Sequence, residues 1–433
     1  MRTEATARPS VPARSGAAAP HPRLEALFQA LDRERVEWCV LRGEAELAEP
    51  QKDVDLLVAR ADLARFGRVA AELGFARVPA WGYGPHAFFV AYDAPGDAWL
   101  KLDVVTELAY GPNYSLASGA EAECLARRRR VAGISLLAPD DAFWTLLLHR
   151  LLDKGAVGAR DAAALQALAG SARTDSTLAR LAGSLCPSGW SADRLVAAAA
   201  QGEWPALRSL GPPMAAAWRA RRPGDARRRA AANAGRRWAG KVARHTKRCG
   251  VRVAVLAPDG AGKSTVVGAV AESFYLPARS VRMGLYRTSR PGRRRGLRGV
   301  GLARQLSAQW NGWLRGAYHR RRGRLVLFDR YAYDALMPTR FRYGRLGRIR
   351  RRLLAGAIRP PELVLFLDAP GEVLHARKGE KTVEMLERQR QAYRELLRRL
   401  PRAVVVDASR EPDEVRRAAT AAIWHEYVRR WGM

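Results

Sequence analysis

A glycine-rich turn between an apolar run and a helix-like run constrains the fold of this chain more than any other feature. The turn follows VRVAVL, and its glycines, Gly260 and Gly262, allow backbone N–H groups to approach phosphate oxygens. The helix that follows presents its N-terminus, and hence its dipole, to the same anion. The sequence therefore predicts a phosphate-binding loop made of Ala257, Pro258, Asp259, Gly260, Ala261, Gly262, Lys263, Ser264 and Thr265.

Lys263 and Ser264 give this loop its expected chemistry. A lysine at this position reaches the β- and γ-phosphates of a nucleotide, and the serine hydroxyl ligates Mg²⁺. We therefore expect ATP as the donor substrate and Mg²⁺ as the cofactor. The loop departs from the general pattern GxxxxGK[ST] at its first position, where Ala257 replaces glycine. Phosphate binding alone leaves the reaction that follows open.

The chain is too long for one ordinary hydrophobic core. Its 433 residues favour two or three domains. In the C-terminal half, short apolar runs alternate with longer helix-like segments, which is typical of βαβ units and a parallel sheet. The expected strands are 251–258, 324–330, 362–370 and 403–409. We therefore expect an α/β fold with a P-loop NTPase domain over residues 250–433.

The N-terminal half has a different pattern. Strand-like runs are followed by a helical stretch, in which Asp140 or Asp141 is the expected N-cap of the first helix. A segment with twelve arginine and lysine residues, one histidine and one acid then separates the two halves. The expected division is a disordered tail at 1–21, an α+β domain at 22–138, a helical extension at 139–216 and a basic linker at 217–249.

A second motif lies in RLVLFDRYAYD, where Asp329 and Arg330 end a predicted strand. Ligands of parallel sheets bind along that edge, a carboxylate suits Mg²⁺ or a hydroxyl, and an arginine fork suits a phosphate. With APDGAGKST, this motif resembles the thymidylate kinase family over residues 251 to about 425. The resemblance implies a nucleoside monophosphate kinase-like parallel sheet with flanking helices, in which Asp329 orients the acceptor and Arg330 binds its phosphate. A surface ion pair is the alternative.

The segment after the third predicted strand, GEVLHARKGEKT, resembles the lid of these kinases. The resemblance implies that Arg377, Lys378 and Lys381 cover the transferring phosphoryl group, whose charge cations stabilise. Charges on a helix surface are the alternative. It also implies that residues 407–409 flank the base, whereas Tyr393 is either the helix aromatic of the family or a core residue. The predicted catalytic set is Lys263, Asp329, Arg330, Arg377 and Lys378.

A basic helix with two tryptophans is expected before the second motif. Its apolar residues recur at helical spacing, with arginines between them. They are Leu302, Leu306, Trp310, Trp313, Leu314 and Tyr318. Such a helix can pack against the kinase core, or it can lie on an anionic membrane or hold a lipid-linked acceptor.

Three carboxylates stand out in the N-terminal half. Asp53 and Asp55 flank Val54 in a predicted strand, so they share one face, and Asp103 can join them from a neighbouring strand. Carboxylates converging in this way hold divalent metals for nucleotidyl transfer. The arrangement, with Gly43 upstream, resembles a nucleotidyltransferase of the DNA polymerase β superfamily over residues 22–150. A structural domain with surface aspartates is the alternative.

The formal charge of +33 raises the question of a polyanionic partner. We weigh composition bias and a solvated surface first, peripheral contact with an anionic membrane second and specific nucleic-acid binding last. Four dispersed cysteines, and the absence of an apolar stretch at the N-terminus, favour a cytoplasmic protein, peripheral to the inner membrane face if it contacts lipid. The oligomeric state is left open, with a dimer as one option.

These observations converge on an enzyme. We expect an ATP-dependent phosphotransferase that moves the γ-phosphate to a small phosphate-bearing acceptor, with dTMP or another nucleotide as the family default. One alternative is a kinase and nucleotidyltransferase acting on a sugar or lipid-linked precursor in polysaccharide biosynthesis. Another is an ATP-controlled binding module for membrane or nucleic acid.

Overall fold

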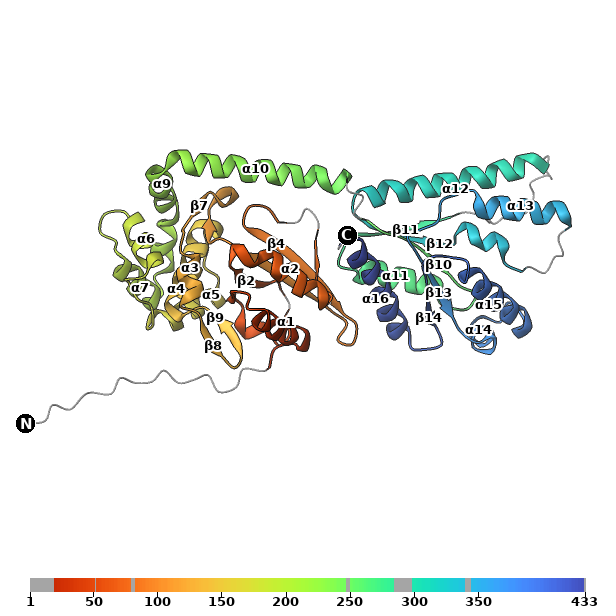
Figure 1. Cartoon of the computed structure of the whole chain (residues 1–433), viewed down its shortest axis with the longest axis horizontal. Helices are drawn as coiled ribbons and strands as arrows, with labels where there is room; N and C mark the ends of the chain where they lie inside the picture. Colours follow the sequence, from red (N-terminus) through yellow and green to blue (C-terminus); the bar gives the residue numbers. More distant parts are fainter. Residues whose placement is uncertain are drawn as a thin grey trace, which may run out of the picture. The chain divides into compact units, whose positions relative to one another are not determined.

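The computed structural model describes residues 19–50, 52–78, 82–246, 250–283, 298–338 and 344–431 (Figure 1). Most of the predicted tail at 1–21, the end of the predicted linker at 247–249 and the basic stretch at 284–297 lie outside the described residues. The chain divides into two compact units. The first comprises Met1–Val69, Lys101–Pro112 and Leu116–Pro223, and the second comprises Ala70–Leu100, Asn113–Ser115 and Gly224–Met433.

The first unit is built on a mixed sheet. Its strands run in the order β5-β2-β1-β9-β8, with β2 parallel to β5 and antiparallel to β1. The aromatic rings of Phe28 and Trp38 stack 4.6 Å apart and hold the first helix against this sheet. The elements are α1 (Pro22–Arg33), β1 (Trp38–Arg42), β2 (Val54–Val58), α2 (Leu63–Glu72), β5 (Ala98–Val105), β6 (Ala109–Tyr110), β7 (Leu116–Ala117), α3 (Glu121–Ala126), β8 (Arg129–Val131) and β9 (Ile134–Leu136).

Helices follow the sheet and share an apolar core with it, to which Cys39 and Leu57 of the strands contribute. The first of them, α4 (Pro139–His149), is buried over most of its length, with Phe143 and Trp144 fully covered. The later helices contribute leucine and alanine side chains to the same core. They are α5 (Ala159–Ala169), α6 (Thr177–Leu185), α7 (Ala192–Gln201), α8 (Trp204–Ser209) and α9 (Gly211–Arg221).

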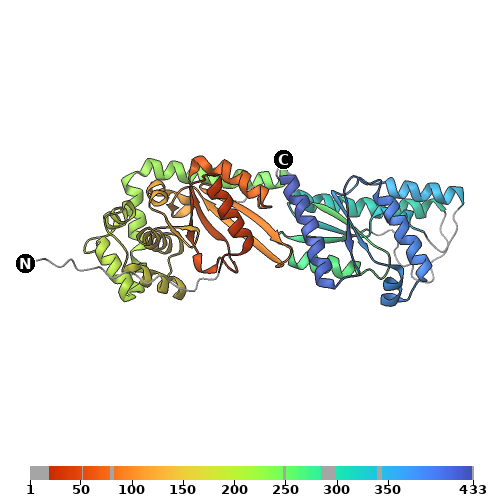
Figure 2. The same ribbon diagram turned by 60° about the horizontal axis from the view of Figure 1, so that its bottom comes forward.

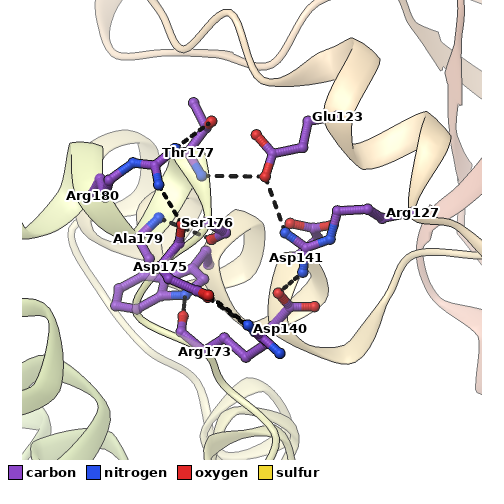
Figure 3. A network of polar contacts seen from close by, with 11 residues as sticks. Glu123, Arg127, Asp140, Asp141, Arg173, Asp175, Ser176, Thr177, Ala179 and Arg180 are labelled. Carbon is purple, nitrogen blue, oxygen red and sulfur yellow. Dashed lines mark hydrogen bonds and ion pairs between the residues drawn. The ribbon is translucent and has the colours of Figure 1, made fainter.

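A polar network fixes the start of α4 (Figure 3). The Arg127 guanidinium donates to Asp140 and to Glu123 Oε1, and Glu123 accepts from the backbone N–H of Thr177 in α6. The prediction that Asp140 or Asp141 caps α4 was wrong, because Ala138 is the N-cap residue and makes no side-chain bond. Both carboxylates lie in the first turn of the helix, and both form ion pairs with the Arg127 guanidinium.

The second unit contains a five-stranded parallel sheet. Its strands run in the order β11-β12-β10-β13-β14, and each neighbouring pair is parallel. The prediction of an α/β chain with a parallel sheet is confirmed, and each of the four predicted runs contains a strand. The strands are β10 (Arg252–Leu256), β11 (Ala278–Arg282), β12 (Leu325–Asp329), β13 (Leu363–Asp368) and β14 (Ala403–Asp407).

Helices cover both faces of this sheet (Figures 1 and 2). Val253 and Val255 of β10 face one core, which α11 (Lys263–Ser273) and α16 (Pro412–Trp431) close. Ala254 and Leu256 face the other core, to which α12 (Arg298–Arg321) and α15 (Val383–Leu397) contribute. The alternation follows from the period of two of a β-strand. The remaining helices are α13 (Arg345–Gly356), α14 (Gly371–Lys378) and the short η5 (Ala332–Leu336).

A hairpin from earlier in the sequence belongs to the same unit. Its strands, β3 (Ala76–Arg77) and β4 (His86–Asp93), are antiparallel. Trp99, at the start of β5, also belongs to this second unit. Its ring lies 5.1 Å from that of Trp424 in α16 and 5.2 Å from that of Phe274 after α11, and its Nε1 donates to the carbonyl of Ser273. Much of the predicted linker forms α10 (Pro223–Thr246). No helix among the described residues is long and apolar enough to cross a bilayer.

Candidate phosphate-binding site

The glycine-rich loop joins β10 to α11 in a conformation that only glycine adopts easily. Gly260 has φ +92° and Gly262 has φ +73°, both in the left-handed region. A Cβ atom on Gly260 would lie 2.5 Å from the carbonyl oxygen of Leu374, so the backbone passes closer than any side chain permits. Gly262 is the N-cap residue of α11, and Lys263 and Ser264 therefore occupy its first turn. The loop thus presents a helix N-terminus to solvent.

The strand order places this loop where a ligand is expected. β10 is the middle strand, with β12 on one side and β13 on the other. The chain leaves β10 for the β11–β12 side and later crosses to β13, so the order reverses at β10. In open parallel sheets ligands bind in the crevice outside the carboxyl ends of the strands at such a point.

Asp329 faces the loop from the carboxyl end of β12. Its register partner in β10 is Val255, and its Oδ1 lies 3.9 Å from Lys263 Nζ. Asp329 Oδ2 lies 3.6 Å from the Arg282 guanidinium, whose side chain is largely exposed. The Asp329 carboxylate is 9% exposed, and within the part of the chain that the structure describes its Oδ1 has no hydrogen-bond partner. A buried carboxylate oxygen in this state favours an additional cation or donor.

These residues fit a bound Mg²⁺. Magnesium in phosphoryl-transfer sites is commonly held by one or two carboxylates, a hydroxyl and phosphate oxygens. Asp329 and the exposed hydroxyl side chain of Ser264 supply the protein ligands of that kind. Among the described residues, no group of three or more His, Cys, Asp or Glu side chains is arranged to hold a metal ion by itself. The phosphates would therefore complete the coordination.

Arg330 has a strained backbone. Its φ of +71° lies in the left-handed region, where a side chain with a Cβ costs about 1 kcal/mol or more. It directly follows the buried Asp329, and its charge acts on the nearby carboxylates of Asp259 and Asp334. Strained residues of this kind cluster at ligand sites. The conformation turns the chain sharply at the sheet edge.

Sequence reasoning missed Asp334, which lies in the same site. Its carboxylate is hydrogen bonded by the Tyr393 hydroxyl at 3.0 Å, and Tyr393 itself is 5% exposed. Burial raises the pKa of Asp334, and the charges of Lys263 and Arg330 oppose that shift. The residue was missed because no motif spacing marks a carboxylate in a short 3₁₀ turn. Tyr393 is both a core residue and a partner in the site.

The predicted lid cations separate into two groups. Lys381 Nζ lies 2.6 Å from Asp259 Oδ2 in the loop and 3.0 Å from Gln389 Oε1. Burial acts to raise the pKa of Asp259, but the hydrogen bond and charge of Lys381 outweigh it, so that this pKa is lowered. The Arg377 guanidinium instead donates to the carbonyl of Ala408 at 2.7 Å, beside the predicted base loop.

Lys378 Nζ lies 3.2 Å from Glu380 Oε2, and both side chains are exposed. Lys381 is therefore the cation of the three that forms an ion pair with the phosphate loop. Among the described residues, Arg377 and Lys378 make their hydrogen bonds and ion pairs elsewhere. Their predicted catalytic role stays a prediction. Asp407 accepts hydrogen bonds from Ser409, which closes the loop after β14.

Helix α12 contributes a buried amide to the second unit. Gln309 is 0% exposed, and neither its Oε1 nor its Nε2 has a hydrogen-bond partner among the described residues. Gly312 and Gly316 bring the same side of the helix onto the sheet, since a Cβ on each would lie 2.6 Å from Met283 Sδ and 2.5 Å from Phe328 Cζ. Gln309 lies one turn before Gly312 in this helix.

The predicted apolar helix residues fall into two sets. Trp313 packs into the core under the Arg252 guanidinium, and Leu302 and Leu306 pack near Leu354 of α13. The other three are exposed: Trp310, Leu314 and Tyr318. Both interpretations of this helix, core packing and an outward apolar face, therefore describe parts of it.

The N-terminal carboxylates lie on neighbouring strands. Asp55 of β2 is the register partner of Asp103 in β5, and Asp53 directly precedes β2. Burial raises the pKa of Asp53; the charge of Lys101 opposes this shift and the other two carboxylates add to it. Asp55 accepts from Arg42 Nε at 2.8 Å, so one of its oxygens already has a cationic partner. The three carboxylates interact electrostatically, but among the described residues they do not form a group arranged to hold a metal ion by itself, and their metal role stays a prediction.

Comparisons with known proteins give a limited result. No family model matches the sequence, and no curated protein matches it. Among solved structures, the thymidylate kinase of Candida albicans is similar over 39% of this chain and 89% of its own, with 17% sequence identity and a TM-score of 0.33. A likeness of that strength adds nothing to the strand order and loop geometry described above.

Proposed function

We propose that the chain is an ATP-dependent phosphotransferase that transfers the γ-phosphate of ATP to a phosphate-bearing acceptor. The observation that supports this most is the approach of Lys263 Nζ to the buried, incompletely bonded Asp329 carboxylate. A lysine that follows a glycine-rich turn binds the donor phosphates, and a carboxylate beside it can hold Mg²⁺ or orient a hydroxyl. A module that only binds ATP, without transferring phosphate, would not need a carboxylate such as Asp329 beside the lysine.

The roles of the residues follow from charge and position. Lys263 holds the β- and γ-phosphates, the backbone N–H groups after Gly260 bind their oxygens, and Ser264 and Asp329 hold Mg²⁺, which neutralises charge on the phosphates. Arg330 binds the acceptor phosphate. Lys381, which is held on Asp259, is released to the transferring phosphoryl group when ATP enters. Phosphoryl transfer needs positioning and charge neutralisation more than covalent chemistry.

The acceptor is proposed to be a nucleoside monophosphate, dTMP or another, by the family resemblance. The buried amide of Gln309 supports an acceptor with hydrogen-bonding groups, because both polar atoms of the side chain lack hydrogen-bond partners among the residues that the structure describes. A sugar phosphate or lipid-linked precursor has such groups too. Direct comparison of these classes as acceptors distinguishes them.

The test is phosphate transfer to a panel of nucleotides, sugar phosphates and polyprenyl phosphates, read by mass spectrometry. Lys263→Ala is expected to reduce transfer by about 100-fold or more, because it removes a donor from the developing charge. Lys154→Ala, at an exposed lysine in the first unit, is the matched control. Transfer by Lys263→Ala at the wild-type rate would overturn the proposal, as would ATP hydrolysis that no acceptor stimulates.

A second activity is supported by the register of Asp55 and Asp103. We assign residues 22–138 to a nucleotidyltransferase-like domain in which Asp53, Asp55 and Asp103 hold divalent metals, followed by a helical extension to 216, a basic linker to 249 and the phosphotransferase domain. Asp53→Asn with Asp55→Asn is expected to abolish nucleotidyl transfer while phosphate transfer continues. Nucleotidyl transfer that persists in this double variant argues against the metal site.

A further inference from the structure

Helix α12 presents an apolar stripe to solvent. Trp310, Leu314 and Tyr318 are 48%, 56% and 52% exposed, and their spacing of four residues aligns them along one side of the helix. The sheet binds another side, through Gly312 and Gly316. Packing of the domain core therefore does not account for the stripe.

Helix α13 presents a second stripe. Leu346, Ile349 and Leu353 are 83%, 45% and 57% exposed at positions i, i+3 and i+7. Leu354 packs near Leu302 and Leu306 of α12, and the Arg350 guanidinium donates to Gln305 Oε1 at 2.9 Å. The two helices thus adjoin each other on the flank of the sheet (Figure 1). We call their exposed apolar side chains and the exposed arginines beside them the α12–α13 face.

The charge of this face has one sign. Each helix contains five arginines and neither contains an Asp or Glu. The Arg322 guanidinium lies 5.1 Å from the ring centroid of the exposed Tyr318. The exposed arginines of the face are Arg304, Arg315, Arg321, Arg322, Arg345, Arg348 and Arg352.

The combination of exposed apolar side chains and arginines on this face argues against two kinds of binding partner and favours a third. A second copy of the chain would bring the same arginines against these ones, which is repulsive. A nucleic acid would neutralise the arginines but leave the leucines and isoleucine in water. An anionic bilayer satisfies both, because its headgroups pair with arginine and its interface accepts Trp, Tyr and Leu side chains.

The opposite flank of the same sheet differs. There the aromatic side chains of α16 are covered within the unit, since Trp424 packs against Trp99 and is 4% exposed. The α12–α13 face has no such cover among the described residues. We propose that this face docks the phosphotransferase domain on an anionic lipid bilayer, with α12 and α13 lying in the headgroup region.

The test is co-sedimentation of the full chain with vesicles. One set is pure phosphatidylcholine, and the other mixes it with an equal part of phosphatidylglycerol. Wild type is expected to bind the anionic vesicles and not the neutral ones. Changing Arg304, Arg315 and Arg321 together to Glu is expected to weaken binding by about 100-fold or more, at about 1 kcal/mol for each arginine near the surface.

A separate triple variant tests the apolar part. Trp310→Ser, Leu314→Ser and Tyr318→Ser together are expected to weaken binding at least tenfold while the charge is unchanged. The matched control changes exposed arginines of the first unit, Arg208→Glu, Arg219→Glu and Arg222→Glu, and is expected to retain most of the binding. All nine side chains are exposed or mainly exposed, so the thermal midpoint should not change, and each variant is checked for it.

Three outcomes overturn the proposal. An equal loss in the control shows that net charge alone is responsible. Unchanged vesicle binding in the serine triple, with loss of a dimer in sedimentation velocity, assigns the stripe to a second copy. Loss of oligonucleotide binding in the glutamate triple without loss of vesicle binding assigns the arginines to nucleic acid. Each outcome is independent of phosphate transfer.

Discussion

Lys263 Nζ, in the first turn of α11, lies 3.9 Å from Asp329 Oδ1 at the carboxyl end of β12. That separation allows an ion pair but is too long for a hydrogen bond, so this buried carboxylate oxygen has no hydrogen-bond partner among the described residues. The relationship places the lysine of the glycine-rich loop beside a carboxylate that can accept a further cation or donor. Substitution of Asp329 is therefore the most direct test of the site.

Asp329→Asn is expected to reduce the affinity for ATP with Mg²⁺ at least tenfold and phosphate transfer at least about 100-fold, since the amide is a poor magnesium ligand. It should not destabilise the free protein by more than about 1 kcal/mol, because it removes a buried charge. Calorimetric titration and thermal unfolding measure the two effects. A large loss of stability with unchanged affinity would assign Asp329 a structural role.

Gly260→Ala is expected to destabilise the second unit by about 2 kcal/mol or more and to abolish ATP binding. The added Cβ meets the carbonyl oxygen of Leu374 at 2.5 Å, and the φ of +92° is strained for alanine. Gly268→Ala is the control. Gly268 lies inside α11, and a methyl group added there would meet no atom within 4 Å, so that change should stabilise by about 1 kcal/mol. Equal effects of the two changes would contradict the role of Gly260 in the loop.

Gln309→Leu is expected to increase the free energy of unfolding by about 1 kcal/mol, because it removes a fully buried amide that has no hydrogen-bond partner in the described ranges. We also expect kcat/KM for the acceptor to fall at least tenfold while the affinity for ATP is unchanged. Denaturant unfolding and steady-state kinetics with the best acceptor measure the two quantities. Reduced stability with unchanged kinetics would show that the amide serves packing instead.

Asp141 predicts a pH dependence in the first unit. Burial, and then repulsion from Asp140, raise its pKa from 3.8 to about 6, and its side chain is 1% exposed. Between these two pH values the folded state binds more protons than the unfolded state. The contribution of Asp141 to the free energy of unfolding is therefore fully present below about pH 4 and is lost as the pH rises through about 6. The loss should be roughly 2 to 3 kcal/mol.

Asp141→Asn keeps the shape without the ionisable group and should flatten this part of the stability curve. Thermal unfolding of the wild type and this variant between pH 4 and pH 7 measures the difference. The same slope in both proteins would show that another group is responsible. Asp175→Asn, at an exposed position, is the control. The hydrogen bond from Arg173 lowers the pKa of Asp175, so this carboxyl titrates at more acidic pH and its removal should leave the slope between pH 4 and pH 7 unchanged.

Much of the candidate site was predictable because its residues act through local backbone conformation. APDGAGKST requires left-handed glycines and a following helix, and both are found at Gly260 and Gly262. The parallel strands were predictable too, since their apolar runs are buried on both faces. The N-cap of α4 was not, because Asp140 pairs with Arg127, which follows a different helix, α3.

The sequence by itself determined the identity of the phosphate loop, the alternation that makes a parallel sheet and the presence of a basic, Trp-bearing helix. The tertiary structure decided which groups meet: Asp329 with Lys263, Lys381 instead of Arg377 with the loop, and Trp313 inward while Trp310 faces solvent. The reason is physical. Backbone torsions follow from neighbouring residues, whereas the partner of a charged or aromatic side chain depends on strands and helices that are distant in the sequence.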